Sequence, residues 1–219
     1  MNYSELVQAI KDYTENTETT FVSQIPTFVQ QAEQIIHRTV LIPELRKNVT
    51  ASMTANNRFL IRPSDFLAPF SIAVVDGNGD YSFLLTKDVN FVREAYPNKT
   101  TTGLPKFYAE FDGDVQSTNS AGHFILGPTP DIAYEVQLHY YFDPPSIVTS
   151  STSWLGENAD MALLYGALLE AYTFMKGEPE LITLYETRFN QEVSRLKNLA
   201  EARGRKDEYR YDSLRTQIT

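Results

Sequence analysis

The chain has 219 residues, of which 42% are hydrophobic and 21% charged, a composition typical of a globular protein with one large domain or two small ones. Nineteen basic against twenty-eight acidic residues leave a net charge of −9, which argues against a protein whose main task is to bind nucleic-acid phosphates. The chain contains no cysteine, which excludes disulfides, thiolate catalysis and zinc sites with cysteine ligands.

Nothing in the sequence indicates export or membrane insertion. The first five residues lack the basic and then apolar run of a signal peptide. The most apolar stretch, Met161–Met175, is about fifteen residues long and contains Glu170, whereas a membrane span needs about twenty apolar residues. The sequence therefore predicts a soluble protein that is neither secreted nor anchored.

The first forty-two residues have the pattern of two helices. Ser4 is a candidate cap for a short helix that runs to about Thr14. Ser23 is a candidate cap for a second helix, with Pro26 in its first turn, where a missing N–H costs nothing. Apolar residues recur at three- and four-residue steps along this second helix, so it should bury one face before Pro43 ends it.

From Arg46 to about Val148 the pattern changes to short strands. The sequence Asp76–Asp80 (DGNGD) strongly indicates the turn of a β-hairpin, and Asp88 is a candidate cap for a short helix through Tyr96. Gly, Asn and Ser residues between 112 and 122 indicate an exposed loop. The expected strands are Arg58–Arg62, Ser71–Val75, Tyr81–Leu85, Phe107–Phe111, His123–Leu126 and Ala133–Phe142.

From Asn158 onward the chain is again helical. Met161–Met175 is apolar on nearly every side, so it must be covered all round, by its own domain or by a neighbouring subunit. We expect Pro179 to begin a last helix and Gly204 to end it. The residues expected to pack between subunits are Leu164, Leu168 and Tyr172.

These patterns predict an α+β fold in which helices from both ends form one bundle around an inserted antiparallel β domain. The expected boundaries are 1–42 with 158–204 for the helical bundle and 43–157 for the inserted β-rich domain. Residues 205–219 have little apolar content and are expected to form a C-terminal arm.

The side chains that carry chemistry do not form a recognisable catalytic or metal-binding pattern. His37, His123 and His139 lack a second ligand at metal-binding spacing, and no nucleophile-elbow or phosphate-loop motif occurs. The glycine-rich run from Asp76 resembles a calcium loop, but Lys87 stands where that loop needs a glutamate. We therefore expect neither an enzyme nor a bound cofactor or metal.

The charge distribution along the chain is uneven. Residues 195–219 hold seven basic and four acidic side chains, a net charge of +3, which leaves −12 for the rest. An acidic body with a basic, tyrosine-bearing end suggests docking onto a protein partner, although a solvated C-terminus would look similar. The candidate partner-binding residues are Arg203, Arg205, Lys206, Tyr209, Arg210 and Tyr211.

Several segments of the chain, taken together with their order and spacing, are similar to segments of one protein family. They include Val22–Glu33 (VSQIPTFVQQAE), Pro63–Leu67 (PSDFL), Phe124–Pro128 (FILGP) and Trp154–Asp160 (WLGENAD), with Gly103-Leu104-Pro105 and Tyr140–Pro144 between them. On these segments the chain resembles the head-to-tail adaptor, or connector, proteins of short-tailed phages, particularly the type common in marine podophages.

The resemblance implies a structural virion protein without enzymatic activity. Twelve copies would form a ring below the portal protein, extend the DNA channel without binding DNA specifically, and dock tail nozzle or fibre proteins. The protein would be in the host cytoplasm during assembly and then in the portal-proximal tail of the virion. A tail nozzle or fibre-attachment protein, a tail-associated hydrolase and a DNA-packaging accessory protein are the alternatives.

Overall fold

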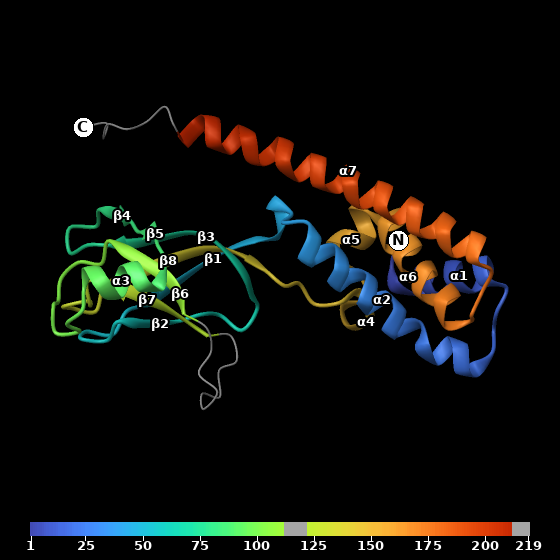
Figure 1. Cartoon of the computed structure of the whole chain (residues 1–219), viewed down its shortest axis with the longest axis horizontal. Helices are drawn as coiled ribbons and strands as arrows, with labels where there is room; N and C mark the ends of the chain where they lie inside the picture. Colours follow the sequence, from blue (N-terminus) through green and yellow to red (C-terminus); the bar gives the residue numbers. More distant parts are fainter. Residues whose placement is uncertain (112–121, 212–219) are drawn as a thin grey trace. The chain divides into compact units, whose positions relative to one another are not determined.

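The computed structural model describes residues 1–111 and 122–211 of the chain, with side chains as far as Arg203 (Figure 1). The structure divides into two compact units. One is helical and consists of Met1–Glu44 together with the chain from Pro144 onward, and the other is the β unit Leu45–Asp143. Helices at both ends and largely antiparallel sheets between them confirm the expected α+β class.

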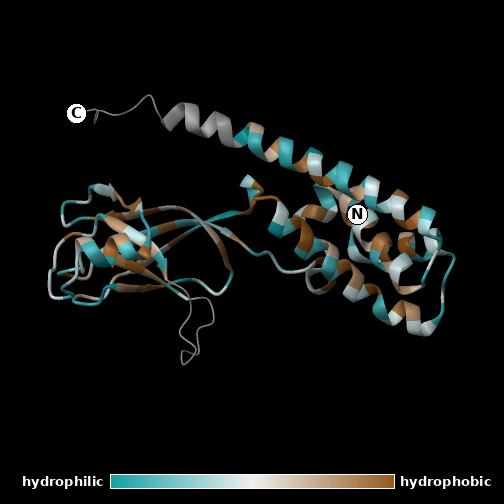
Figure 2. Cartoon of the chain, in the orientation of Figure 1, coloured by the Kyte–Doolittle hydropathy of each residue, from teal (hydrophilic) through white to brown (hydrophobic). Residues whose placement is uncertain are grey.

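The helical unit is built around α6. The helices α1, α2, α5 and α7 of the same chain all pack against it. Figure 2 shows that hydrophilic and hydrophobic residues alternate along the coloured part of α7, as expected of a helix with one buried face. The helices are α1 (Tyr3–Thr14), α2 (Thr19–Thr39), α4 (Ile147–Ser150), α5 (Trp154–Asn158), α6 (Asp160–Phe174) and α7 (Pro179–Tyr211).

The N-termini of the first two helices differ from expectation. The cap of α1 is Asn2 rather than Ser4, because Asn2 and Glu5 form a reciprocal capping box in which each side chain accepts the other's backbone N–H. Helix α2 begins at Thr19, so Pro26 lies in its interior and not in its first turn. The early turn holds despite the proline because its Phe21 is buried in the core with 1% of its surface exposed.

Helix α7 is longer than predicted. We expected Gly204 to end it, and the helix continues to Tyr211. A single glycine costs only about 1 kcal/mol in a helix interior, and the neighbouring Ala202, Arg203, Arg205 and Lys206 are all strong helix formers. The start of the arm expected at 205–219 is therefore helical, and 212–219 lie outside the described residues.

The β unit is a sandwich of two four-stranded sheets, ordered β1-β8-β3-β4 and β2-β7-β6-β5. Buried side chains of both sheets, among them Ile72, Phe124 and Leu138, form one core between them. All strand pairs are antiparallel except the short pair β5–β6. The strands are β1 (Arg46–Ser52), β2 (Phe59–Ile61), β3 (Phe66–Val75), β4 (Tyr81–Phe83), β5 (Leu85–Thr86), β6 (Phe107–Phe111), β7 (His123–Gly127) and β8 (Glu135–Phe142).

Helix α3 (Val89–Ala95) covers the outer face of the sheet that contains β6 and β7, and its cap is Asp88 as predicted. The helix lies so close to β7 that a Cβ on Gly127 would be 2.8 Å from a ring carbon of Tyr96 and 3.0 Å from a methyl of Val92. Glycine is thus the residue that this approach requires.

The unit boundaries also differ from the expected ones. The predicted β domain extended to residue 157, whereas the chain leaves the β unit after Asp143. The segment that follows forms α4 and α5, and its Ile147 and Leu155 are almost completely buried, Ile147 within the helical core. A short 3₁₀ turn, η1 (Pro43–Leu45), lies at the first boundary, where the chain passes from the helical unit into the β unit. The loop expected at 112–122 falls almost entirely outside the described residues.

Candidate partner-binding surfaces

The six residues expected to bind a partner lie on the last three turns of α7. Arg203 forms an ion pair with Glu44 inside the helical unit. The backbone places Arg205, Lys206, Tyr209, Arg210 and Tyr211 on the same continuous helix, while their side chains lie outside the described part of the structure. The partner role of these residues remains a prediction.

Two of the three residues expected to pack between subunits are buried within their own chain. Leu164 and Leu168 belong to the core of the helical unit, with 2% and 0% of their surface exposed. Tyr172 is half-buried, donates its hydroxyl to the backbone oxygen of Tyr13 at 2.9 Å and packs against Tyr185 with ring centroids 5.1 Å apart. The burial of Leu164 and Leu168 thus needs no neighbouring subunit, and their role in assembly remains a prediction.

A small apolar hollow lies where η1, α5 and α7 meet. The half-buried Trp154, the only tryptophan of the chain, lines it together with Leu196 and Leu199. The ion pair between Glu44 and Arg203 lies at the same place. Trp154 is therefore an intrinsic fluorescent probe of the helical unit alone.

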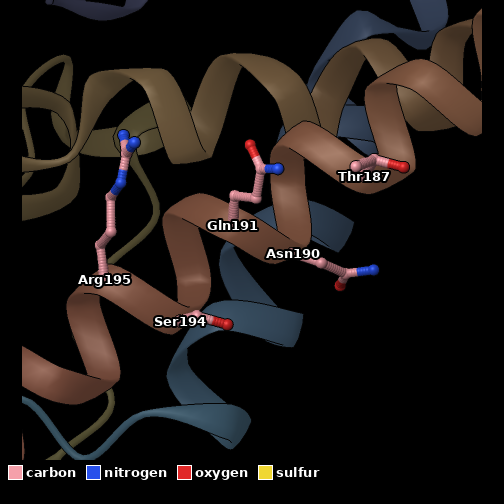
Figure 3. A pocket seen from close by; sticks show the side chains of 5 residues that line it. All are labelled: Thr187, Asn190, Gln191, Ser194 and Arg195. Atoms are coloured by element: carbon pink, nitrogen blue, oxygen red, sulfur yellow. The ribbon is translucent and has the colours of Figure 1, made fainter.

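A second hollow is open to solvent and runs along the exposed face of α7 (Figure 3). Its volume is about 450 Å³, and every residue that lines it comes from the one helix. Arg195 is its only charged residue and forms an ion pair with Glu192, one turn away. The hollow is a groove between surface side chains and brings no acid, base or nucleophile together. Its lining residues are Thr187, Asn190, Gln191, Ser194 and Arg195.

The outer face of the β1-β8-β3-β4 sheet carries an aromatic cluster that the sequence analysis did not single out. Phe70 is 44% exposed, and the guanidinium of Arg46 lies 4.1 Å from the centre of its ring. Arg46 also donates to the Tyr141 hydroxyl at 3.2 Å, and His139 meets Phe70 edge-on with centroids 4.9 Å apart. Burial, and then the charge of Arg46, lowers the pKa of His139, so this histidine is a neutral packing group near pH 7.

A polar network fixes the end of the β unit at which both connections to the helical unit leave. Asp65 accepts hydrogen bonds from Lys47 at 2.6 Å and from the Tyr140 hydroxyl at 2.8 Å. Burial alone would raise the pKa of the Asp65 carboxyl, but these two hydrogen bonds and the Lys47 charge outweigh burial and lower it. Burial, followed by the bond to the Asp65 carboxylate and its charge, raises the pKa of Tyr140 to about 12.

Among the described residues, no three His, Asp or Glu side chains are close enough together to hold a metal ion. His37 is buried on α2, and His123 and His139 lie half-buried on the outward faces of the two different sheets, so the structure does not bring the three histidines together. Within the same residues, the structure has no helix with the length and hydrophobicity of a membrane span.

The features that stand out are surfaces: a long helix with a basic end and an exposed aromatic cluster. In the comparison with known families, the model of the SU10 adaptor protein family matches residues 1–216. The chain belongs to this family of phage head-to-tail adaptors, which are structural proteins and not enzymes. No curated protein matches the chain.

This membership confirms the resemblance inferred from the sequence segments. The short-tailed, marine type of phage remains a prediction.

Proposed function

We propose that twelve copies of this chain form a closed ring beneath the portal protein, where the ring continues the DNA channel and docks tail nozzle or fibre proteins. The observation that carries the proposal is the family match over residues 1–216, which includes both units and the basic end of α7. The protein would assemble in the host cytoplasm and remain in the portal-proximal part of the virion.

The charge of the chain is compatible with a channel through which DNA passes. A net charge of −9 repels phosphates, and the affinity of proteins for DNA comes largely from Lys and Arg side chains that neutralise phosphates. A DNA-packaging accessory protein would instead bind DNA with strong salt dependence. A gel-shift titration at low salt separates the two functions, and we expect no complex at micromolar protein.

The basic end of α7 is the proposed contact with the portal. The eight residues from Gly204 to Tyr211 extend the helix by about 12 Å beyond Arg203. A helix presents its charges at fixed spacing, so docking costs less ordering entropy than it would for a flexible tail.

Replacing Arg205, Lys206 and Arg210 by glutamine tests this contact, since glutamine keeps the helix propensity and removes three charges. If each exposed charge pair contributes about 0.2–1 kcal/mol, the loss of three pairs should lower portal affinity by roughly 3- to 150-fold, and by less at high salt. The measurement is binding of the chain to assembled portal rings, by mass photometry or cryo-electron microscopy.

The matched control replaces Lys11 on α1, Arg38 on α2 and Lys197 on an earlier turn of α7 by glutamine, which removes the same charge from other positions of the same unit. This variant should bind portal rings nearly as well as the unmodified chain. If both triple variants lose affinity equally, the effect reflects net charge and the proposed contact is wrong. If the unmodified chain does not bind assembled portal rings, the proposed function as an adaptor ring is itself refuted.

A further inference from the structure

The strand β1 is an edge of its sheet, and it is unlike the other edges of the β unit. The two sheets have four edge strands, of which β4, β2 and β5 are only three, three and two residues long. β1 has seven residues, Arg46–Ser52, with no proline, glycine or bulge, and all but the first are exposed. Proteins usually protect such edges because they attract further strands.

The register shows which backbone groups of β1 are directed away from β8. Met53 donates its N–H to the oxygen of Tyr134 at 2.8 Å, and this pair continues the antiparallel β1–β8 register. Bonded and non-bonded pairs alternate in an antiparallel ladder. Lys47, Val49 and Ala51 therefore bond to β8. The backbone groups of Asn48, Thr50 and Ser52 are directed outward, in the plane of the sheet.

In the described part of the chain, no backbone or side-chain group bonds to these outward N–H and C=O groups. The side chains of β1 do not block the edge either. Lys47 is the charged residue on the core side of the strand, and its ammonium is held against Asp65. Val49 is 37% exposed at the margin of the core, opposite Leu138, which is 4% exposed. An added strand would both complete the hydrogen bonds and cover Val49.

We propose that the open edge of β1 is a strand-addition site, at which an extended segment of a different virion protein pairs with Asn48, Thr50 and Ser52 as a fifth strand of the sheet. Main-chain hydrogen bonds would supply the affinity, and small apolar side chains facing Val49 and Ala51 would supply the fit. The segment needs about six or seven residues, without proline at the positions that donate.

The lengths of the other edges exclude most contacts with a second copy. The three other edge strands offer at most three residues, which cannot satisfy an edge of seven. Pairing of β1 with β1 of another copy would be a twofold contact, and twofold contacts do not propagate around a ring. This last step rests on the proposed ring. Among the described strands, no edge of a second copy therefore matches β1, and we take the occupant to be an extended segment of another protein in the particle.

Amide hydrogen exchange tests the site with an internal control. In the isolated chain, the N–H groups of Asn48, Thr50 and Ser52 should exchange rapidly, while those of Val49 and Ala51 are protected by β8. In purified phage particles the three outward amides should slow by about 100-fold or more, with little change at Val49 and Ala51. Equal exchange in particles and in the isolated chain overturns the proposal, and so does protection that is already complete in the isolated chain.

The variant Thr50→Pro removes one outward N–H without removing a bond to β8, and proline is tolerated at such positions of edge strands. The control is Thr50→Val, which keeps the N–H and strand propensity. We expect Thr50→Pro to fold and still bind portal rings, yet to reduce incorporation of the partner protein at least tenfold relative to Thr50→Val. Normal incorporation with Thr50→Pro refutes the strand-addition site alone, whereas failure of the unmodified chain to bind portal refutes the proposed function.

The identity of the occupant is tested by cross-linking. Because the chain has no cysteine, Ser52→Cys introduces a single thiol beside the edge. A short thiol-to-amine cross-linker applied to particles should join this position to one defined segment of another virion protein, mapped by mass spectrometry. A cross-link predominantly between copies of this chain, or to another segment of the same chain, contradicts the proposal.

Discussion

Replacing Leu168 by alanine asks whether the apolar helix α6 is held by its own chain or by a neighbouring subunit. Leu168 is completely buried in the core of the helical unit, and α1, α2 and α7 pack around its helix. Leucine-to-alanine changes at buried positions cost about 2–5 kcal/mol, and more where the surroundings cannot collapse into the cavity. Because α6 is enclosed by helices, we expect a loss of about 3–5 kcal/mol in the free energy of unfolding of the isolated chain.

Urea denaturation followed by Trp154 fluorescence measures this loss, because the only tryptophan lies in the helical unit. The loss should be the same at low and high protein concentration, since it arises within one chain. The control is Met161→Ala on the same helix, where 44% of the side chain is exposed and the cost should stay below about 1 kcal/mol.

The opposite result would identify a subunit contact. If Leu168→Ala changes the free energy of unfolding of the isolated chain by less than about 0.5 kcal/mol and weakens only the assembled form, the burial of Leu168 within its own chain is not what stabilises the helix. That outcome would falsify the packing described above and restore the interpretation drawn from the sequence.

Three polar groups, Glu33, Tyr140 and Asp65, lead to further testable expectations. Glu33 accepts the N–H of Ile147 at 2.9 Å in the buried region where the chain re-enters the helical unit. In urea denaturation, Glu33→Ala should lower the free energy of unfolding by about 2–3 kcal/mol and Glu33→Gln by clearly less, because an amide oxygen still accepts the hydrogen bond. Equal losses in the two variants would contradict the role of this bond. The raised pKa of Tyr140 means that the folded β unit favours the protonated phenol, a stabilisation present below pH 10 and lost as the pH rises toward 12. The lowered pKa of Asp65 means a stabilisation present above about pH 4 and lost as the pH falls through the folded value. Thermal denaturation followed by circular dichroism at a series of pH values should show stability falling at both alkaline and acid pH. Tyr140→Phe should reduce the alkaline fall and Asp65→Asn the acid fall. If either fall is unchanged in its variant, the assignment is refuted.

Elements with a strong local signal were predictable from the sequence. The hairpin at Asp76–Asp80 forms because glycine and the Asp76 side chain, which accepts from the N–H groups of Asn78 and Asp80, stabilise the turn. The cap Asp88 and the proline at the start of α7 were equally readable. These residues act within a few positions of themselves, so no tertiary information is needed.

Elements that depend on tertiary contacts were not predictable. The early start of α2 relies on burial of Phe21, and Pro26 alone suggests a later start. The short helices α4 and α5 belong to the helical unit because Ile147 and Leu155 bury there, although their sequence, rich in Ser and Thr, looks like the end of the β region. In each case the distant core outweighs the local preference.

The candidate surfaces divide along the same line. The basic residues near the C-terminus were visible in the sequence because charge is a property of side chains. The aromatic cluster around Phe70 was not, because Arg46 and Tyr141 come to it from two other strands that only the register brings together. The Asp65–Tyr140 pair, 75 positions apart in the chain, was hidden for the same reason.

The edge strand β1 shows why a binding surface of this kind has no side-chain signature. We expected β structure from Arg46 onward but named no strand before Arg58, since Asn48, Thr50 and Ser52 do not alternate with large apolar residues. The strand exists because its other side is bonded to β8 through the whole of its length. Such a strand can offer its outward side to a partner through the backbone alone. Substitutions that keep the N–H of Thr50 should therefore leave partner binding at this edge intact, whereas proline, which removes that N–H, should weaken it.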